Sequence, residues 1–472
     1  MSSPTNLPDL ELASALFQNL DPRQALPATD PRYVDLYHQR IAADPKRKLI
    51  NTLLLSGKES LQFFSGFRGS GKSTELLRLK HQLHHEHGYN VFYADAAQYI
   101  GPNEPLDVSL LRIAIIGSLC VELDRKLGVK DPGASFFKRI GDWISKFRIT
   151  PETIGMEVPA GPLTLSADFK TSFTSNPDFR ADLRKFLANR RAALDEQIKE
   201  FLVGLRTQLE KLVDHKKDIV LIFDQLEQDP GALISTTDRS EIINSAKQLF
   251  QNQRDLLKLP GVHLILTVPS WLKIVLKGVP IVFVPNFPLW KRDEDRTERT
   301  DEMNLMRELV LKRFTLTEGS HAGDQLAAFF APDIQQGIDR LIRQSGGFIR
   351  DLLRLLQIIV RESVSAGPAG DETLTIAIDE LRQSYLPLVA KDAEALLRMM
   401  TLREVGISDS TDEEIARLAN LMNTQMAFFF LNGDDWFDVH PLLREEVQAI
   451  HDREYPSRPA KPAAKKPRSK NS

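Results

Sequence analysis

A glycine-rich octapeptide at residues 66–73, which reads GFRGSGKS, constrains the fold of this chain more than any other feature. It follows the apolar run 61–65 and precedes a helical pattern over 73–87, so it joins a strand to a helix. Its glycines let the backbone curl until successive N–H groups point inward as an anion nest, and the helix start adds partial positive charge. The octapeptide therefore predicts a phosphate-binding loop.

The octapeptide matches the pattern G-x-x-x-x-G-K-[ST] at every fixed position, which assigns a role to each residue type. The Lys72 ammonium is expected to reach the β- and γ-phosphates of ATP, and the Ser73 hydroxyl to bind Mg²⁺. Thr74 is expected on the α-phosphate side. A chance glycine turn is the alternative, against which the flanking strand and helix argue. The predicted nucleotide-binding residues of the loop are Gly66, Arg68, Gly69, Ser70, Gly71, Lys72, Ser73 and Thr74.

Further apolar runs indicate the rest of a sheet. They are short, rich in Val, Ile and Leu, and bounded by turn or polar residues, as buried parallel strands are. Because these strands alternate with helical segments, the pattern predicts an α/β fold built on a parallel sheet. The runs lie at 90–94, 218–223, 262–268 and 281–284.

An acidic residue follows one of these strands. Asp224 comes directly after an apolar run, at the edge of the sheet where ligands bind in open α/β folds, so we expect it to hold Mg²⁺ together with Ser73. An ordinary turn aspartate is the alternative. Hydrolysis also needs a group that orients water, and the next residue is Gln225. Glu227 is therefore the predicted general base; alternatively it is structural, hydrolysis is slow and the nucleotide serves as a switch.

Two polar residues farther along the chain are candidates for phosphate contact. Thr267 lies near the end of the 262–268 run and is predicted to sense the γ-phosphate, unless the backbone satisfies its hydroxyl. Arg350 lies in the first turn of a helix that follows Gly346 and Gly347. A cation there opposes the helix dipole, which favours a role in phosphate binding; a salt bridge with a nearby acid is the alternative.

The predicted organisation has five parts. An N-terminal segment precedes the core, an insertion interrupts the core, and a helical lid, a winged-helix-like unit and a basic tail follow it. The ranges are 1–50, 51–300 with the insertion at 121–217, 301–400, 401–455 and 456–472.

Periodicity gives more detail inside two of these parts. In the insertion, alternation predicts a hairpin over 150–173, and apolar steps of 3, 4 or 7 predict one helix over 178–216. That helix would span about 58 Å, either as a surface for a partner or lying on its own domain. Near the C-terminus, Asn432-Gly433 predicts a hairpin turn between strands at 426–431 and 436–439.

Composition excludes several classes of protein. The chain has 472 residues, of which 42% are hydrophobic and 26% charged, so it is not collagen-like or mainly disordered. Its net charge of −3 includes six positive charges and no acid in 456–472, which leaves −9 on the rest. This Pro/Ala/Lys-rich tail is predicted to be unfolded, and it serves either as a solubilising end or in nonspecific nucleic-acid binding.

The single cysteine, Cys120, excludes an intramolecular disulfide and fits a reducing compartment. The longest apolar stretch is broken by prolines and lysines, so no membrane span is predicted. We therefore expect a soluble, cytoplasmic protein with no membrane partner. His81 and His85 are four residues apart, a spacing that fits either a pair of metal ligands or an exposed helix face. Five arginines follow the 281–284 run, and one of them is a candidate arginine finger: Arg292, Arg296, Arg299, Arg307 and Arg313.

The motif set resembles P-loop ATPases of the AAA+/STAND group, particularly a bacterial set linked to defence or signalling operons. The resemblance rests on SGFRGSGKSTELL at 65–77 and on shorter pieces at 28–33, 223–227, 267–269, 346–350 and 432–443. It implies that Arg350 is a second sensor in a helical lid, as in origin-recognition-type ATPases, whose lid is followed by a winged helix. Gln225 stands where AAA+ members have Glu, which favours a STAND-type switch.

The main functional prediction is an ATPase that acts as a nucleotide-dependent conformational switch or assembly regulator. Its expected partners are further copies of the chain or an effector protein. The alternative is a DNA-binding AAA+ initiator or loader, which the winged-helix-like end and the tail favour and the acidic body opposes. A small-molecule kinase is a third hypothesis, against which the lid and the C-terminal unit argue.

Overall fold

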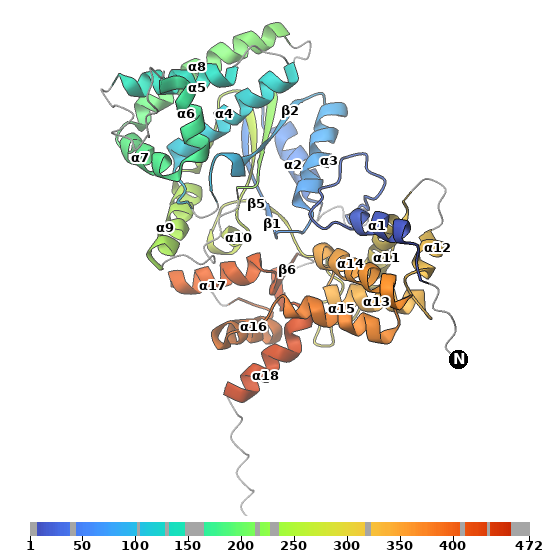
Figure 1. Cartoon of the computed structure of the whole chain (residues 1–472). Helices are drawn as coiled ribbons and strands as arrows, with labels where there is room; N and C mark the ends of the chain where they lie inside the picture. Colours follow the sequence, from blue (N-terminus) through green and yellow to red (C-terminus); the bar gives the residue numbers. More distant parts are fainter. Residues whose placement is uncertain are drawn as a thin grey trace, which may run out of the picture.

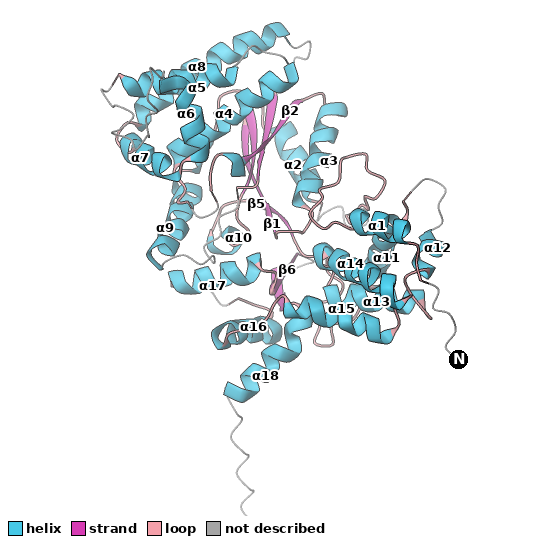
Figure 2. Ribbon diagram, viewed as in Figure 1, coloured by secondary structure: helices cyan, strands magenta, loops and turns pink. Residues whose placement is uncertain are grey.

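The computed structural model describes residues 7–37, 44–101, 104–127, 132–146, 165–212, 218–226, 236–316, 322–405, 411–431 and 435–454. At its centre lies a five-stranded parallel sheet in the order β2-β3-β4-β1-β5, with helices on both faces (Figure 1; Figure 2). All five strands and the α/β class agree with the sequence prediction. The strands are β1 Ser60–Gly66, β2 Asn90–Asp95, β3 Ile219–Asp224, β4 Val262–Thr267 and β5 Ile281–Val284.

The strand order places β4 between β1 and β3. Phe64 of β1 is paired with Thr267 of β4, and Asp95 of β2 is paired with Asp224 of β3. Because all strands are parallel, the phosphate-binding loop and Asp224 emerge at the same edge of the sheet.

Alternation along each strand sends side chains to two different cores. Phe63 belongs to the larger core, whereas Phe64 belongs to a smaller core under α2 (Pro45–Leu55) and α3 (Lys72–His85). On the opposite face, α4 (Val108–Leu127) and α9 (Thr236–Lys247) contribute to the larger core. This period of two is what a sheet buried on both faces requires.

The insertion between β2 and β3 differs from its prediction. Its helices after α4 are α5 Pro132–Ser145, α6 Leu165–Ser175, α7 Pro177–Leu187 and α8 Arg191–Leu212. The hairpin predicted over 150–173 is wrong for residues 165–173, because they belong to helix α6. The rest of the predicted hairpin, 150–164, lies outside the described ranges. Phe169 and Phe173, four residues apart, share one helix face and stack at 6.0 Å.

The single long helix predicted over 178–216 is also wrong, because α7 ends at Leu187 and α8 begins at Arg191. The guanidinium of Arg190 donates to the Phe186 carbonyl at 2.9 Å and lies 4.3 Å from the centre of its ring. The break lets both helices bury their apolar faces in one core, with Phe179 of α7 and Leu194 of α8 both fully buried.

The helical part after the sheet lies beside the N-terminal helix (Figure 1). Helix α1 (Leu10–Asn19) packs on both α11 and α14, so the N-terminal segment shares the core of the lid. The lid helices are α11 Thr300–Phe314, α12 Ala322–Ala327, α13 Ile334–Ser345, α14 Ile349–Ala366 and α15 Asp371–Gln383.

The C-terminal unit has the predicted order of helix, two antiparallel strands and helix. Helix α16 (Ala390–Leu402) packs against β7 and α18. The turn predicted at 432–433 and the tail at 456–472 lie outside the described residues. None of the helices that the structure describes combines the length and the apolar character that a bilayer crossing requires. The unit comprises α17 Asp412–Asn423, β6 Ala427–Leu431, β7 Asp435–Val439 and α18 Arg444–Glu454.

Candidate functional site

The glycine-rich loop links the end of β1 to the start of α3. Gly69 and Gly71 both have φ of +91°, a left-handed conformation that residues with side chains rarely adopt. Lys72 is buried, and its ammonium donates to the carbonyl oxygens of Gly66 and Phe67, each at 2.9 Å. The positive charge of Lys72 therefore lies over a loop whose backbone is shaped to receive phosphate oxygens.

Asp224 and Ser73 meet although they are 151 positions apart in the chain. The Ser73 hydroxyl donates to Oδ2 of Asp224 at 2.9 Å, and the Gln225 amide donates to Oδ1 at 2.8 Å. A third donor, the Tyr93 hydroxyl, bonds to the same Oδ2 as Ser73. Asp224 is only 1% exposed, so these three donors take the place of water around its carboxylate.

Sequence patterns do not predict the role of Tyr93. Burial, and secondly the negative charge of Asp224, raise the pKa of the Tyr93 phenol far above its ordinary value, so it remains a protonated donor. Tyr93 pairs with Ile222, two residues before Asp224. Its sequence signal is a polar aromatic residue near the carboxyl end of an apolar strand, but its role depends on β2 being the neighbour of β3.

The donor set at this edge fits magnesium better than a transition metal. Ser73 and Asp224 offer adjacent oxygen ligands at the start of α3, and Mg²⁺ is commonly held by one or two such ligands plus substrate phosphates. His81 and His85 have ring centres 4.3 Å apart. Within the described ranges, however, no group of three or more His, Cys, Asp or Glu side chains is placed to hold a metal ion.

A cavity of about 670 Å³ opens in front of the loop, a volume in the range of small-molecule sites. Loop residues 68–74 line one wall together with Tyr93, Asp224 and Gln225. The facing walls come from the N-terminal segment within 22–37 and from lid helices α11 and α14. Gly66 of the loop does not line the cavity.

Arg350 approaches the loop from the lid. It is the second residue of α14 and lines the cavity, and its side chain crosses Gly69 so closely that a Cβ there would lie 2.4 Å from the Arg350 Nε. The turn before α14 is equally tight. A Cβ on Gly347, whose φ is +79°, would lie 2.4 Å from the Phe287 carbonyl oxygen. Lys72 and Arg350, both predicted from sequence, thus line one cavity.

The N-terminal segment forms a wall that sequence patterns did not predict. The Tyr33 hydroxyl donates to Glu75 of α3 at 3.1 Å, and the Arg78 guanidinium lies 3.6 Å from the centre of the Tyr33 ring. The Leu26 amide donates to the Thr74 hydroxyl at 3.1 Å. These contacts attach the segment to the first turns of α3, where Thr74 lines the cavity.

Thr267, a predicted phosphate contact, does not line the cavity. The Thr267 hydroxyl accepts from the Leu226 amide at 3.1 Å and contacts the Phe223 carbonyl at 3.5 Å, so the backbone satisfies it, as the sequence alternative held. In this position Thr267 shapes the turn after β3. Glu227 lies outside the described residues, and its role as general base stays a prediction.

The five arginines after β5 have separate environments. Arg313 lines the cavity, and burial, followed by the charge of Arg32, lowers the pKa of its guanidinium to about 10. Arg292 is exposed. The other three form ion pairs within the chain: Arg296 with Asp438, Arg299 with Glu302, and Arg307 with Asp339.

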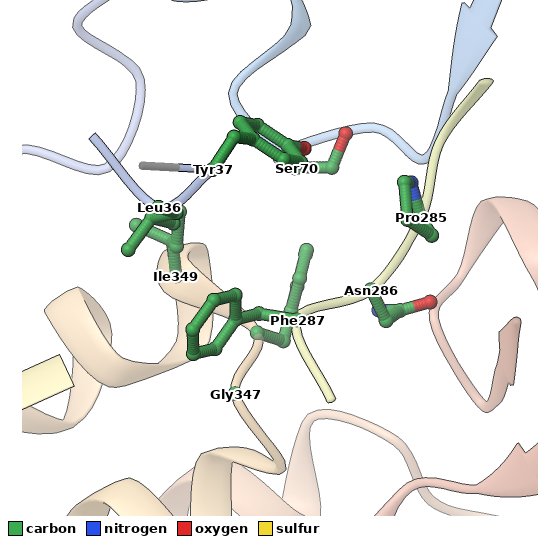
Figure 3. A pocket seen from close by; sticks show the side chains of 9 residues that line it. Leu36, Tyr37, Ser70, Pro285, Asn286, Phe287, Gly347 and Ile349 are labelled. Carbon is green, nitrogen blue, oxygen red and sulfur yellow. The ribbon is translucent and has the colours of Figure 1, made fainter. Parts of the chain in front are cut away.

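A second, much smaller cavity of about 20 Å³ lies behind the loop (Figure 3). Figure 3 shows Tyr37 and Ser70 above it, Leu36 and Ile349 on one side, Asn286 on the other, and Phe287 and Gly347 below. Four segments that are distant in sequence therefore meet within a space of about one water molecule.

No protein-family model and no curated protein matches this sequence. Several solved structures are similar over most of the chain. Cdc6p from Pyrobaculum aerophilum is 12% identical, with 93% of this chain and 98% of that chain covered and a TM-score of 0.32. The Aeropyrum pernix ORC1 protein in complex with DNA is 13% identical, with 88% and 92% covered and a TM-score of 0.31.

A Walker-type ATPase of Pyrococcus abyssi is 15% identical to this chain. The alignment covers 92% of this chain and 99% of that one, at a TM-score of 0.36. Membership of the STAND or defence-associated group is not tested by these similarities and stays a prediction.

Proposed function

We propose that this protein binds and hydrolyses ATP with Mg²⁺, and that the nucleotide sets the position of the lid relative to the sheet. One observation carries the proposal. The same cavity is walled by Lys72 of the loop, by the Ser73–Asp224 pair and by Arg350 of the lid. A phosphate chain bound there would touch both parts of the molecule.

Each charged group in the cavity has a different proposed role. Lys72 from the loop and Arg350 from the lid offset the charge of the terminal phosphates, and loop amides hold the phosphate oxygens. Mg²⁺, held by Ser73 and Asp224, would supply further charge neutralisation during phosphoryl transfer. We assign the orientation of the attacking water to Glu227. Gln225, which lines the cavity, cannot act as a base, and slow turnover is the expectation.

An apolar wall of the cavity suits the nucleotide base. The side chains of Leu26, Val34, Leu309 and Leu353 are all buried and line the cavity. A flat heterocycle that packs against this wall would take its own apolar surface out of water, at about 25 cal/mol per Å². We infer that the base lies here, between the N-terminal segment and the lid, and the phosphates lie on the loop.

A ligand that contacts two parts of a molecule biases their arrangement. If ATP binds only the closed arrangement, a concentration of 100 times its Kd supplies about 2.7 kcal/mol. That shifts the population ratio of two arrangements by about a hundredfold. We propose that self-association or control of an effector protein follows from this shift, as in the AAA+/STAND ATPases that the motifs resemble.

DNA binding is the second candidate function. The C-terminal unit supports it, because a helix is followed by two antiparallel strands and a second helix, as in a winged helix. The six positive charges of 456–472 support it as well. The charge of −9 on the remaining residues opposes it, because nucleic-acid affinity depends heavily on cationic contacts to phosphate.

Calorimetry with Lys72→Ala tests the nucleotide site. Removing the ammonium from the loop should abolish measurable ATP binding in the presence of Mg²⁺, whereas the wild-type protein should bind. Lys48→Ala is the matched control, since Lys48 is exposed on α2. Unchanged ATP affinity in Lys72→Ala would refute the assignment of the site.

Two measurements, each made with and without DNA, separate the two functions. They are the rate of ATP hydrolysis and the mass of the protein assembly in solution. ATP-dependent assembly that ignores DNA supports the switch. Turnover that DNA stimulates supports the initiator or loader, and absence of turnover under all conditions contradicts the assignment of an ATPase.

A further inference from the structure

The turn that precedes α14 rests on the C-terminal hairpin. Phe348, at the cap of α14, is buried in a separate aromatic cluster with Phe428, Phe430 and Trp436. A Cβ on Gly346 would lie 2.4 Å from the Phe428 ring and 2.8 Å from Cδ of Pro441. The start of the lid helix that carries Arg350 is therefore in direct contact with β6 and with the segment after β7.

Asp351, the residue after Arg350, joins the same two parts through a buried hydrogen-bond network. Its Oδ2 accepts from His440 Nε2 at 3.1 Å and from the Tyr385 hydroxyl. The amide of Leu442 donates to the other ring nitrogen of His440 at 3.2 Å, so the hydrogen of a neutral ring is on Nε2. Arg354 adds a bond to Oδ1 at 3.3 Å.

Both central groups of this network are inaccessible to water: Asp351 is 1% exposed and His440 0% exposed. Burial alone would raise the pKa of the Asp351 carboxyl, but the hydrogen bonds from His440 and Tyr385 hold it below its ordinary value. The carboxylate is thus ionised and depends on its donors, because a buried charge without partners is strongly disfavoured.

Helix geometry connects this network to the nucleotide site. Successive residues of an α-helix point about 100° apart. Arg350 extends over Gly69 into the cavity, and Asp351 points into the buried network with His440. A rotation or shift of the first turn of α14 that breaks the Asp351–His440 bond also moves Arg350.

We propose that His440 is a positioning residue for Arg350, so that docking of the C-terminal unit regulates the preference of the site for ATP over ADP. The inference rests on the proposed function and deepens it. The two effects are reciprocal: ATP favours the docked C-terminal unit, and docking favours ATP over ADP. Any partner that draws β6, β7 and the segment after them away from α14 would lower the affinity for ATP.

The test measures the Kd of ATP and of ADP, each with Mg²⁺, by calorimetry on full-length variants. In His440→Ala the ratio of ATP to ADP affinity should fall about tenfold, a typical magnitude for coupled sites. His440→Gln, whose amide nitrogen can take the place of Nε2, should restore most of the ratio. Tyr385→Phe removes one hydroxyl donor and should shift the ratio in the same direction as His440→Ala.

A double variant separates positioning from general damage. In an Arg350→Ala background, His440→Ala should cause no further change in the ratio, because its effect passes through Arg350. His451→Ala is the matched control, a partly exposed histidine on α18, and should leave both affinities unchanged. If His440→Ala does not fold, Tyr385→Phe and His440→Gln carry the test.

Several outcomes overturn the inference. Equal losses of ATP and ADP affinity, an unchanged ratio, or an additional fall in the Arg350→Ala background would each reduce His440 to a structural residue. A His440→Gln variant as defective as His440→Ala would also exclude the donor role. If the wild-type protein binds no ATP at all, the proposed function fails first. If it shows an ATP preference that depends on Arg350 but not on His440, the inference alone fails.

Discussion

At the scale of single residues, two glycines of the loop have the same backbone and different surroundings. Gly69 and Gly71 share a φ of +91°, but only Gly69 has Arg350 across it, while a Cβ on Gly71 would meet no atom within 4 Å. At Gly71 only the left-handed backbone favours glycine, whereas at Gly69 the Arg350 side chain also occupies the space that a Cβ would need.

Alanine at either position should lower the free energy of unfolding by about 1–2 kcal/mol, the cost of a left-handed residue with a side chain. Gly69→Ala should lose no more than Gly71→Ala, because the end of the Arg350 side chain is flexible and swings aside. Urea unfolding measures both values. A loss several kcal/mol larger in Gly69→Ala would mean that Arg350 is held rigidly over the loop.

At the scale of elements, the sequence predicted strands better than insertion helices. A run such as 219–223 is apolar throughout and ends at a turn, which admits little besides a buried parallel strand. The α6 stretch was ambiguous, since Phe169 and Phe173 fit either a strand face or a helix face. The break between Leu187 and Arg191 follows from packing both helices into one core, which local periodicity does not encode.

The candidate site shows the same division between local and long-range information. Lys72 and Ser73 belong to one short motif, so their neighbourhood is readable from the chain. Asp224 was predictable because a single carboxylate follows a buried strand. Tyr93 was not, because its contact with Asp224 depends on which strands are neighbours. The Thr74–Leu26 bond likewise joins segments 48 positions apart.

At the scale of the whole molecule, charge is distributed unevenly, with six positive charges in 456–472 and −9 on the rest. Deleting 456–472 should weaken any DNA binding and reduce the slope of log K against log salt by up to about 5. ATP affinity should not change, because the residues that line the cavity lie between Pro22 and Leu353. Fluorescence anisotropy at several salt concentrations gives the slope.

A full-length variant with glutamine at the six basic positions of the tail is the control for chain length. It should behave like the deletion. A salt slope that neither change alters would show that the tail does not contact DNA, and any DNA affinity would then belong to the folded part of the molecule.

The stacking of Trp436 on Phe430, with ring centres 4.4 Å apart in the cluster that also holds Phe348, has an optical consequence. An indole that is 1% exposed emits from an apolar environment, and water that enters when the lid leaves the hairpin would shift its emission to longer wavelengths. The molecule thus carries its own fluorophore at the joint between lid and C-terminal unit, and undocking of the two, which the proposal expects ATP to oppose, can be followed in real time without any label.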